Sequence, residues 1–235
     1  MARVKKAIDY IQELCLSRGE SRRALGNLLQ LKYNLWTETL ALGDFLDFNE
    51  TIMENKNALG VAQFFGKFRA YAFEEYVYRL LKEKIRINKP LELFWGEKCL
   101  VWREGGKKYS LEFDISIGKK VGKNVDPAIV FDAKVELDSA RLKTALASFM
   151  ILKRWKTDAK CILVYIVKEV DDTFLWLAKT GLMESSSSAP KTTKPTPSLI
   201  MLLNSLRPIY ARKFFQPQIS RFPFPALSRV IIVSA

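Results

Sequence analysis

The 235-residue chain can bury a hydrophobic core, and its 49% hydrophobic and 27% charged residues are typical of a globular protein. It has no histidine and only three well-separated cysteines, which excludes histidine general bases, Ser-His triads, His- or Cys-x-x-Cys zinc sites and a disulfide framework. No apolar run reaches membrane-spanning length and the first residues form no signal-peptide core, so we expect a cytoplasmic protein with no membrane partner.

The net charge of +13 is unevenly distributed along the chain. Residues 1–59 carry 8 basic and 8 acidic side chains, residues 60–184 carry 23 and 17, and residues 185–235 carry 7 and none. This distribution favours a polyanionic partner, and nucleic acid is preferred to an anionic membrane because no basic amphipathic helix stands out. A basic protein without a polyanionic partner is the alternative.

The N-terminal 59 residues are predicted to form a helical hairpin that packs on the rest of the protein. Apolar residues at helical spacing mark its first helix: Val4, Ile8, Ile11 and Cys15. Leucines three and four apart then follow Ser21, an expected N-cap, and predict a second helix through residue 46.

A long helix is predicted from about Gly60 to Arg86. One side of this helix carries an apolar stripe, made of Val61, Phe64, Phe65, Phe68 and Ala72. Glu75 falls inside the stripe, whereas its neighbour Glu74 points about 100° away. Because an isolated buried carboxylate is costly, we expect Glu75 to have a partner or to bind a cation.

From residue 91 onward the apolar pattern changes to period two. Strands are predicted at "LELFWG", "CLVWRE", "KYSLEFDISIG" and "AIVFDAKVE", with a Gly105-Gly106 turn between the second and the third. A helix from Asp138 to Trp155 follows, and "KCILVYIVK" and "TFLWLAK" are two more predicted strands. This order predicts an α/β core, residues 60–183, with a mixed central β-sheet flanked by helices.

The C-terminal part has a different composition. Residues 184–198, "ESSSSAPKTTKPTPS", are predicted to be a linker, and residues 199–235 a basic tail of unknown role. Basic residues interleaved with phenylalanine suit phosphate contact and base stacking, so the tail is a candidate nucleic-acid-binding arm. A partner-binding strand and a tail without a specific role are the alternatives.

The strand "AIVFDAKVE" carries both an acid and a lysine on one face. If residues 128–136 are extended, Asp132 and Lys134 point to the same side and lie roughly 6.5 Å apart along the strand. Asp114 lies on the polar side of the preceding predicted strand, which we expect to be a neighbour in the sheet. Three acid-x-Lys triplets occur in the chain, and only the Asp132 triplet lies within an apolar strand.

These elements resemble the PD-(D/E)XK nuclease superfamily, the fold of many restriction endonucleases and archaeal junction resolvases. "EFDISIG" supplies the first aspartate as Asp114, and "IVFDAKVE" supplies the (D/E)xK element as Asp132 and Lys134, followed by a helix and a further strand. The upstream helix with Glu75 also suits the family, so the resemblance covers roughly residues 60–170.

The sequence departs from the family pattern in two places. No proline precedes Asp114; the one Asp-Pro pair, Asp126-Pro127, has the reverse order, which makes Asp126 the second candidate for the first acid. The following helix also lacks a glutamine and a tyrosine four residues apart, which argues against the RecB-like branch.

The resemblance implies a restriction endonuclease-like core that hydrolyses DNA with Mg²⁺, or Mn²⁺ in its place, as a homodimer. It implies that Asp114, Asp132, the Ala133 carbonyl and Glu75 bind the metal, since Mg²⁺ prefers oxygen ligands. It assigns Lys134 to positioning or deprotonating the attacking water. Candidate phosphate contacts are the nearby basic residues Lys119, Lys120, Lys123, Arg141 and Lys143.

Two other functions remain open at this point. The first is a non-catalytic nucleic-acid-binding or architectural protein on the same fold, with DNA preferred to RNA as the partner. The second is a protein-interaction module whose basic tail binds an acidic partner.

Overall fold

The computed structural model describes residues 6–183, and the chain divides into two compact units between Ile85 and Arg86. The linker and basic tail predicted for residues 184–235 lie outside the described residues. Among residues 6–183, no helix combines the length and the apolar character needed to cross a membrane.

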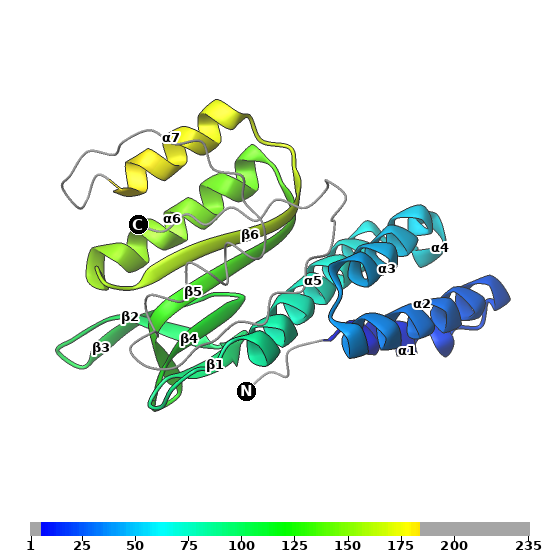
Figure 1. Cartoon of the computed structure of the whole chain (residues 1–235), viewed down its shortest axis with the longest axis horizontal. Helices are drawn as coiled ribbons and strands as arrows, with labels where there is room; N and C mark the ends of the chain where they lie inside the picture. Colours follow the sequence, from blue (N-terminus) through cyan, green and yellow to red (C-terminus); the bar gives the residue numbers. More distant parts are fainter. Residues whose placement is uncertain (1–5, 184–235) are drawn as a thin grey trace, which may run out of the picture. The chain divides into compact units, whose positions relative to one another are not determined.

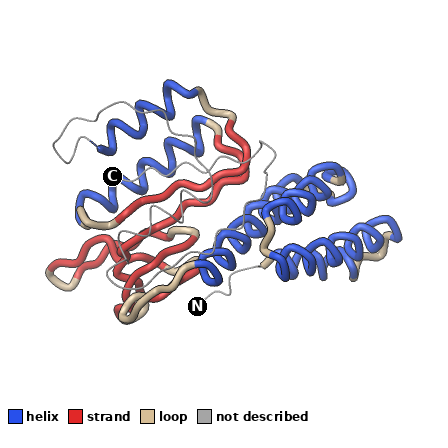
Figure 2. The backbone as a smooth tube through the Cα atoms, viewed as in Figure 1, coloured by secondary structure: helices blue, strands red, loops and turns tan. Residues whose placement is uncertain are grey.

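The described part of the first unit consists of helices (Figures 1 and 2). They are α1 (Ala7–Cys15), α2 (Glu20–Thr39), α3 (Leu42–Glu54), α4 (Lys56–Leu59) and α5 (Ala62–Lys84). The sequence predicted one helix across residues 21–46, but the structure divides it at Leu40, which has a left-handed backbone with φ of 50°. The Leu40 N–H donates to the Trp36 carbonyl at 2.9 Å and so caps α2.

Buried aromatic side chains from several helices form the core of this unit. Tyr10 of α1 stacks on Phe68 of α5 with ring centroids 5.2 Å apart, and Phe45 of α3 stacks on Tyr76 of α5 at 4.5 Å. Trp36 of α2 meets Phe45 edge-on at 5.5 Å. The sequence predicted a boundary between residues 59 and 60, whereas these contacts place α5 with the N-terminal helices because its aromatic stripe packs against them.

The second unit is a mixed open β-sheet with helices. Its strands are β1 (Glu92–Trp95), β2 (Lys98–Glu104), β3 (Lys107–Glu112), β4 (Ile115–Val121), β5 (Asn124–Leu137) and β6 (Lys160–Lys168). The strand order is β1-β4-β5-β2-β3, and β6 also pairs with β5. The β5·β6 and β2·β5 pairs are parallel, and the remaining pairs are antiparallel. The mixed α/β class predicted from the sequence is therefore confirmed.

Two predicted strands of this unit have a different structure. "KYSLEFDISIG" is divided into β3 and β4 by a break at Phe113 and Asp114. "TFLWLAK" lies in helix α7 (Asp172–Met183), whose first turn is capped by Asp171 Oδ1, 2.8 Å from the Thr173 N–H. These backbone bonds also lower the pKa of Asp171. A short apolar run does not distinguish helix from strand by periodicity alone.

Helices α6 (Ser139–Trp155) and α7 share one hydrophobic core with β2, β5 and β6 (Figure 1). Asp138 caps α6, because its Oδ1 accepts the Arg141 N–H at 2.7 Å. Cys99 and Cys161 are free buried thiols in this core, and burial raises their pKa to about 11 and about 12. They therefore stay protonated at neutral pH.

A β-bulge near the start of β5 sets which face each of its side chains occupies. The pairing of β4 with β5 shifts register between Ile117 and Gly118, so Ile117 lies opposite Ile129 and Gly118 lies opposite Pro127. A Cβ atom on Gly118 would lie 2.3 Å from the Asp126 carbonyl oxygen, so only glycine fits there. Beyond the bulge, buried Phe131 and Ala133 alternate with half-buried Asp132 and Lys134, as predicted.

Candidate active site

Strands β4 and β5 bring Asp114 and Asp132 to neighbouring positions in the sheet. The last register pair between these strands is Ile115 with Phe131, so residues 114 and 132 occupy the next position along the antiparallel ladder. Asp132 pairs with Leu163 and Lys134 with Tyr165 of β6, and both of these β6 side chains belong to the core under α6. Asp132 and Lys134 therefore project from the sheet face that α6 covers.

Backbone hydrogen bonds hold Asp114 in place. Its Oδ2 accepts the Ala133 N–H at 2.7 Å, and its carbonyl oxygen accepts the Gly96 N–H at 2.9 Å. Strand β4 begins only at Ile115, so the carboxylate takes a ladder position that a strand carbonyl would otherwise fill. The break between β3 and β4 thus points the Asp114 side chain toward β5.

Lys134 lies between the two carboxylates. Its Nζ forms an ion pair with Asp132 Oδ1 and lies 3.6 Å from Asp114 Oδ2. The side chains are 25% exposed for Lys134, 25% for Asp114 and 13% for Asp132, so solvent reaches the trio. Two carboxylates and one ammonium give a formal charge of −1 at neutral pH. We call Asp114, Asp132 and Lys134 the charged trio.

The surroundings of Asp114 favour its protonated form. Burial raises the pKa of Asp114 to about 6, and the neighbouring Asp132 carboxylate adds to the rise. Lys134 and the Ala133 N–H act in the opposite direction, since both stabilise the charged carboxylate. The pKa remains raised because burial outweighs these two stabilising contacts.

The charged trio suits a hard divalent cation. Mg²⁺ binds through one or two carboxylates and keeps several of its waters, and Asp114 and Asp132 can supply such a pair. Among residues 6–183 no group of three or more Asp, Glu, His or Cys side chains forms a metal cluster. A cation held at the charged trio would therefore bind the two aspartates and complete its coordination with waters or backbone oxygens, the Ala133 carbonyl being the predicted one.

Glu75 lies in the helical unit, where partners from the same unit surround its carboxylate. Oε1 accepts hydrogen bonds from Tyr33 Oη and Arg79 Nε, both at 2.9 Å, and Oε2 accepts the Ala7 N–H at 3.0 Å. The residue is fully buried, as its place in the apolar stripe predicted. Burial and the Glu75 carboxylate both raise the pKa of Tyr33, which stays a hydrogen-bond donor. Both oxygens of Glu75 thus have local roles, and its assignment as a metal ligand stays a prediction.

Asp126, the second candidate for the first acid, lies elsewhere on β5. Its Oδ1 is 2.6 Å from Lys156 Nζ, just after the end of α6. Asp126 precedes Asp132 by six residues, which corresponds to roughly 20 Å along an extended strand. Asp114 is therefore the acid that shares a site with Asp132.

The five predicted phosphate contacts have different environments. Lys119 and Lys123 are exposed near the turn between β4 and β5, and Lys120 of the same hairpin forms an ion pair with Glu97 at 2.9 Å. Arg141 lies 3.2 Å from Asp138 and 3.4 Å from Glu136. Lys143 lies over the Phe174 ring at 5.9 Å from its centroid. Arg141 and Lys143 lie near the end of β5 that carries the charged trio, whereas the hairpin lysines lie near its start.

Sequence reasoning missed two structural partners of these sites. The hydrogen bond from the Ala133 N–H to the Asp114 carboxylate could not be predicted from the sequence, because it depends on the break between β3 and β4. Lys156 was also missed as the partner of Asp126, because it follows other basic residues at the end of a helix and nothing in the sequence sets it apart from them.

Neither a scan against protein-family models nor a search of the curated proteins finds a match to this chain.

Proposed function

We propose that the protein is a metal-dependent endonuclease that hydrolyses phosphodiester bonds in DNA. The observation that carries the proposal is the convergence of Asp114 and Asp132 on Lys134 at adjoining positions of β4 and β5. The succession β4, β5, α6 and then β6 parallel to β5 agrees with the strand, helix and strand order that the PD-(D/E)XK resemblance implies.

Each member of the charged trio has a role in this chemistry. Hydrolysis adds water across one P–O bond, and negative charge builds on the phosphate oxygens in the transition state. Bound Mg²⁺ would neutralise that charge and acidify a water molecule. Asp114 and Asp132 would hold the cation, and the Lys134 ammonium would orient the attacking water and offset charge on the phosphate.

The partner and the assembly are part of the same proposal. The chain carries a net charge of +13, and exposed Lys119 and Lys123 can contact the phosphate backbone. Cutting both strands of a duplex or a junction takes two active sites, which a homodimer would supply.

A plasmid and a branched DNA, each incubated with Mg²⁺ or Mn²⁺, test this function. We expect metal-dependent cutting by the wild type and a loss of about a thousandfold or more in rate for Asp132→Asn, since the variant loses a cation ligand. Asp126→Asn is the matched control, because Asp126 lies on the same strand but pairs with Lys156. Absence of cutting, or equal cutting by wild type and Asp132→Asn, rejects the proposal.

One observation favours a non-catalytic nucleic-acid-binding protein on the same fold as the second candidate. Lys134 already compensates part of the charge of both carboxylates, and the charged trio has two acids rather than three. This alternative predicts DNA binding that weakens with salt, no cleavage, and no change on adding Mg²⁺. A DNA titration at two salt concentrations, run beside the cleavage assay, distinguishes the two.

A further inference from the structure

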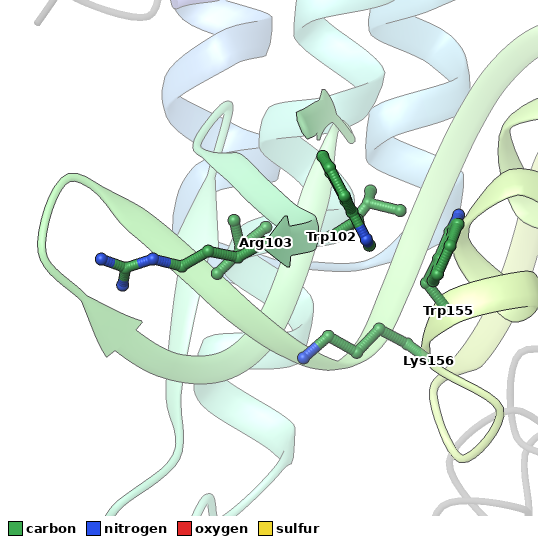
Figure 3. A pocket seen from close by; sticks show the side chains of 6 residues that line it. Trp102, Arg103, Trp155 and Lys156 are labelled. Atoms are coloured by element: carbon green, nitrogen blue, oxygen red, sulfur yellow. The ribbon is translucent and has the colours of Figure 1, made fainter. Parts of the chain in front are cut away.

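A pocket lies in the sheet unit, near the start of β5. It measures about 250 Å³ and is lined by Leu100, Val101, Trp102, Arg103, Trp155 and Lys156 (Figure 3). Strand β2 is in register with β5 at one pair, Cys99 with Val125, and β6 pairs with β5 from Ile129 onward. The pocket therefore lies where the pairing partner of β5 changes from β2 to β6. None of its lining residues belongs to the charged trio.

Aromatic side chains dominate the pocket. The rings of Trp102 and Trp155 lie 5.9 Å apart with a tilt of 51°, and Figure 3 shows them facing each other. Trp102 packs on the core and is held by it, whereas Trp155 at the end of α6 is 53% exposed. Tyr109 lies directly opposite Trp102 in the β2·β3 ladder and is 48% exposed. The pocket therefore offers one anchored indole and one accessible indole, and the accessible Tyr109 ring lies beside it on the hairpin.

One cation, Lys156, lies beside these rings, and others lie on the opposite face of the hairpin. Lys156 extends along the pocket and reaches Asp126 at 2.6 Å. On the other face of the β2·β3 hairpin, Arg103 lies directly opposite Lys108, and Figure 3 shows Arg103 pointing away from the two indoles. Like charges directly opposite each other destabilise a ladder unless an anion compensates them. Lys107 and Arg154 are also exposed nearby in the sequence, and Glu104 is the one acid of this hairpin turn.

We propose that this pocket binds unpaired bases of a single-stranded nucleic acid, which stack on Trp155 and on the neighbouring Tyr109. Accessible aromatic rings with basic side chains near them are the combination that holds single strands, since every base has a face that can stack and every nucleotide has a phosphate. Bases in a duplex are already stacked and do not reach such rings.

The chain's own C-terminal segment is the other available occupant, and its charge disfavours it. Residues 185–235 contain seven basic and no acidic side chains, so their charge has the same sign as that of Lys156 beside the pocket. A polyanion has the opposite charge. The pocket lies near Asp126, roughly 20 Å along β5 from Asp132, so binding here does not depend on the proposed cleavage.

Binding of labelled oligonucleotides to the full-length chain tests the pocket. The probes are a 15-nucleotide oligothymidylate, a strand of equal length with abasic sugars, and a duplex of 15 base pairs. We expect oligothymidylate to bind at least fivefold tighter than the abasic strand, and its binding to quench tryptophan fluorescence. Trp155→Ala should weaken oligothymidylate binding about tenfold, whereas Trp155→Phe should restore most of it.

Matched variants separate stacking from general effects. Trp176 of α7 is 61% exposed, so Trp176→Ala controls for loss of a surface tryptophan and should leave the affinity unchanged. Lys156→Gln should lower the slope of log affinity against log salt by about one. Lys168, which pairs with Asp172, supplies the matched control Lys168→Gln.

Three results would overturn the proposal: Trp155→Ala binding as tightly as wild type, the abasic strand binding as well as oligothymidylate, or a peptide of residues 185–235 quenching tryptophan fluorescence where oligothymidylate does not. Asp132→Asn keeps the failure of this proposal distinct from that of the nuclease proposal. If the pocket binds single strands, that variant retains the binding whether or not the wild type cuts DNA.

Discussion

Glu75 in the helical unit and Asp114 in the sheet unit are both acids in largely apolar surroundings, and they differ in how their charge is compensated. Glu75 receives three hydrogen bonds, and its Oε1 forms an ion pair with Arg79 at 2.8 Å. Asp114 receives one backbone hydrogen bond and shares Lys134 with Asp132. Glu75 therefore has one cation, Arg79, to itself, whereas Asp114 and Asp132 share one cation, Lys134.

This difference separates a structural carboxylate from a candidate ligand. A buried carboxylate with all its hydrogen bonds made stabilises the helices that supply them, and removing it leaves their donors unpaired. A carboxylate that is incompletely compensated retains affinity for a further cation, at a cost to the fold when the cation is absent. Local compensation of charge, rather than burial alone, therefore indicates which acid is available for chemistry.

The largest effect on stability is expected for Glu75→Gln. The amide cannot accept from Tyr33, Arg79 and Ala7 together, so we expect the free energy of unfolding to fall by about 3 kcal/mol. Urea unfolding of the full chain measures this loss. Glu74→Gln is the control at the adjoining, less buried position and should change stability little. A stable Glu75→Gln protein that no longer binds Mg²⁺ would instead make Glu75 a ligand.

Gly118→Ala tests whether the β-bulge between β4 and β5 is needed to bring Asp114 and Asp132 together. The new Cβ would lie 2.3 Å from the Asp126 carbonyl oxygen, so β4 and β5 must separate, and we expect a loss of about 2 kcal/mol or more. Weaker Mg²⁺ binding should accompany the loss. Gly66→Ala in α5 is the control, because nothing lies within 4 Å of its added Cβ and helical alanine is favoured by about 0.5–1 kcal/mol. Equal stability changes in the two variants would contradict the role of the bulge.

Lys134→Gln sharpens the contrast by leaving the two acids without their shared lysine. We expect Mg²⁺ affinity to rise about tenfold, because the cation no longer competes with the ammonium, while DNA cleavage falls. Isothermal titration calorimetry measures the affinity, and Lys120→Gln, which removes a lysine paired with Glu97, is the control. If Lys134→Gln lowers Mg²⁺ affinity, the lysine supports the metal site rather than competing for it.

The most gradual effect is expected from pH. Because the pKa of Asp114 is raised to about 6, the folded protein keeps a proton between about pH 4 and 6 that the unfolded chain releases. The free energy of unfolding should therefore fall by roughly 1 to 3 kcal/mol as pH rises through this range, and Mg²⁺ affinity should rise until about pH 6 and then level off. Asp114→Asn should remove this part of both dependences, as urea unfolding and calorimetry at several pH values can show.

The sequence by itself determined the faces of individual elements. Period-two spacing put Asp132 and Lys134 on one side of a strand. Helical spacing put Glu75 in the apolar stripe, where it is buried, and Glu74 outside the stripe, where it is less buried. The Gly105-Gly106 turn was predicted because two glycines separate two strand patterns, and in the structure both glycines adopt positive φ, 53° and 78°. These features follow from the fixed geometry of one helix or one strand, which local residue order controls.

Only the tertiary structure decided which partners these faces meet. The break at Asp114, the membership of α5 in the first unit, the helical form of residues 172–183 and the approach of Trp155 to Trp102 all depend on residues distant in sequence. Short apolar segments are compatible with several structures, and packing against the rest of the chain selects one of them. The charge balance around Glu75 and Asp114 has the same origin, because a side chain's partners are set by long-range pairing and not by spacing along the chain.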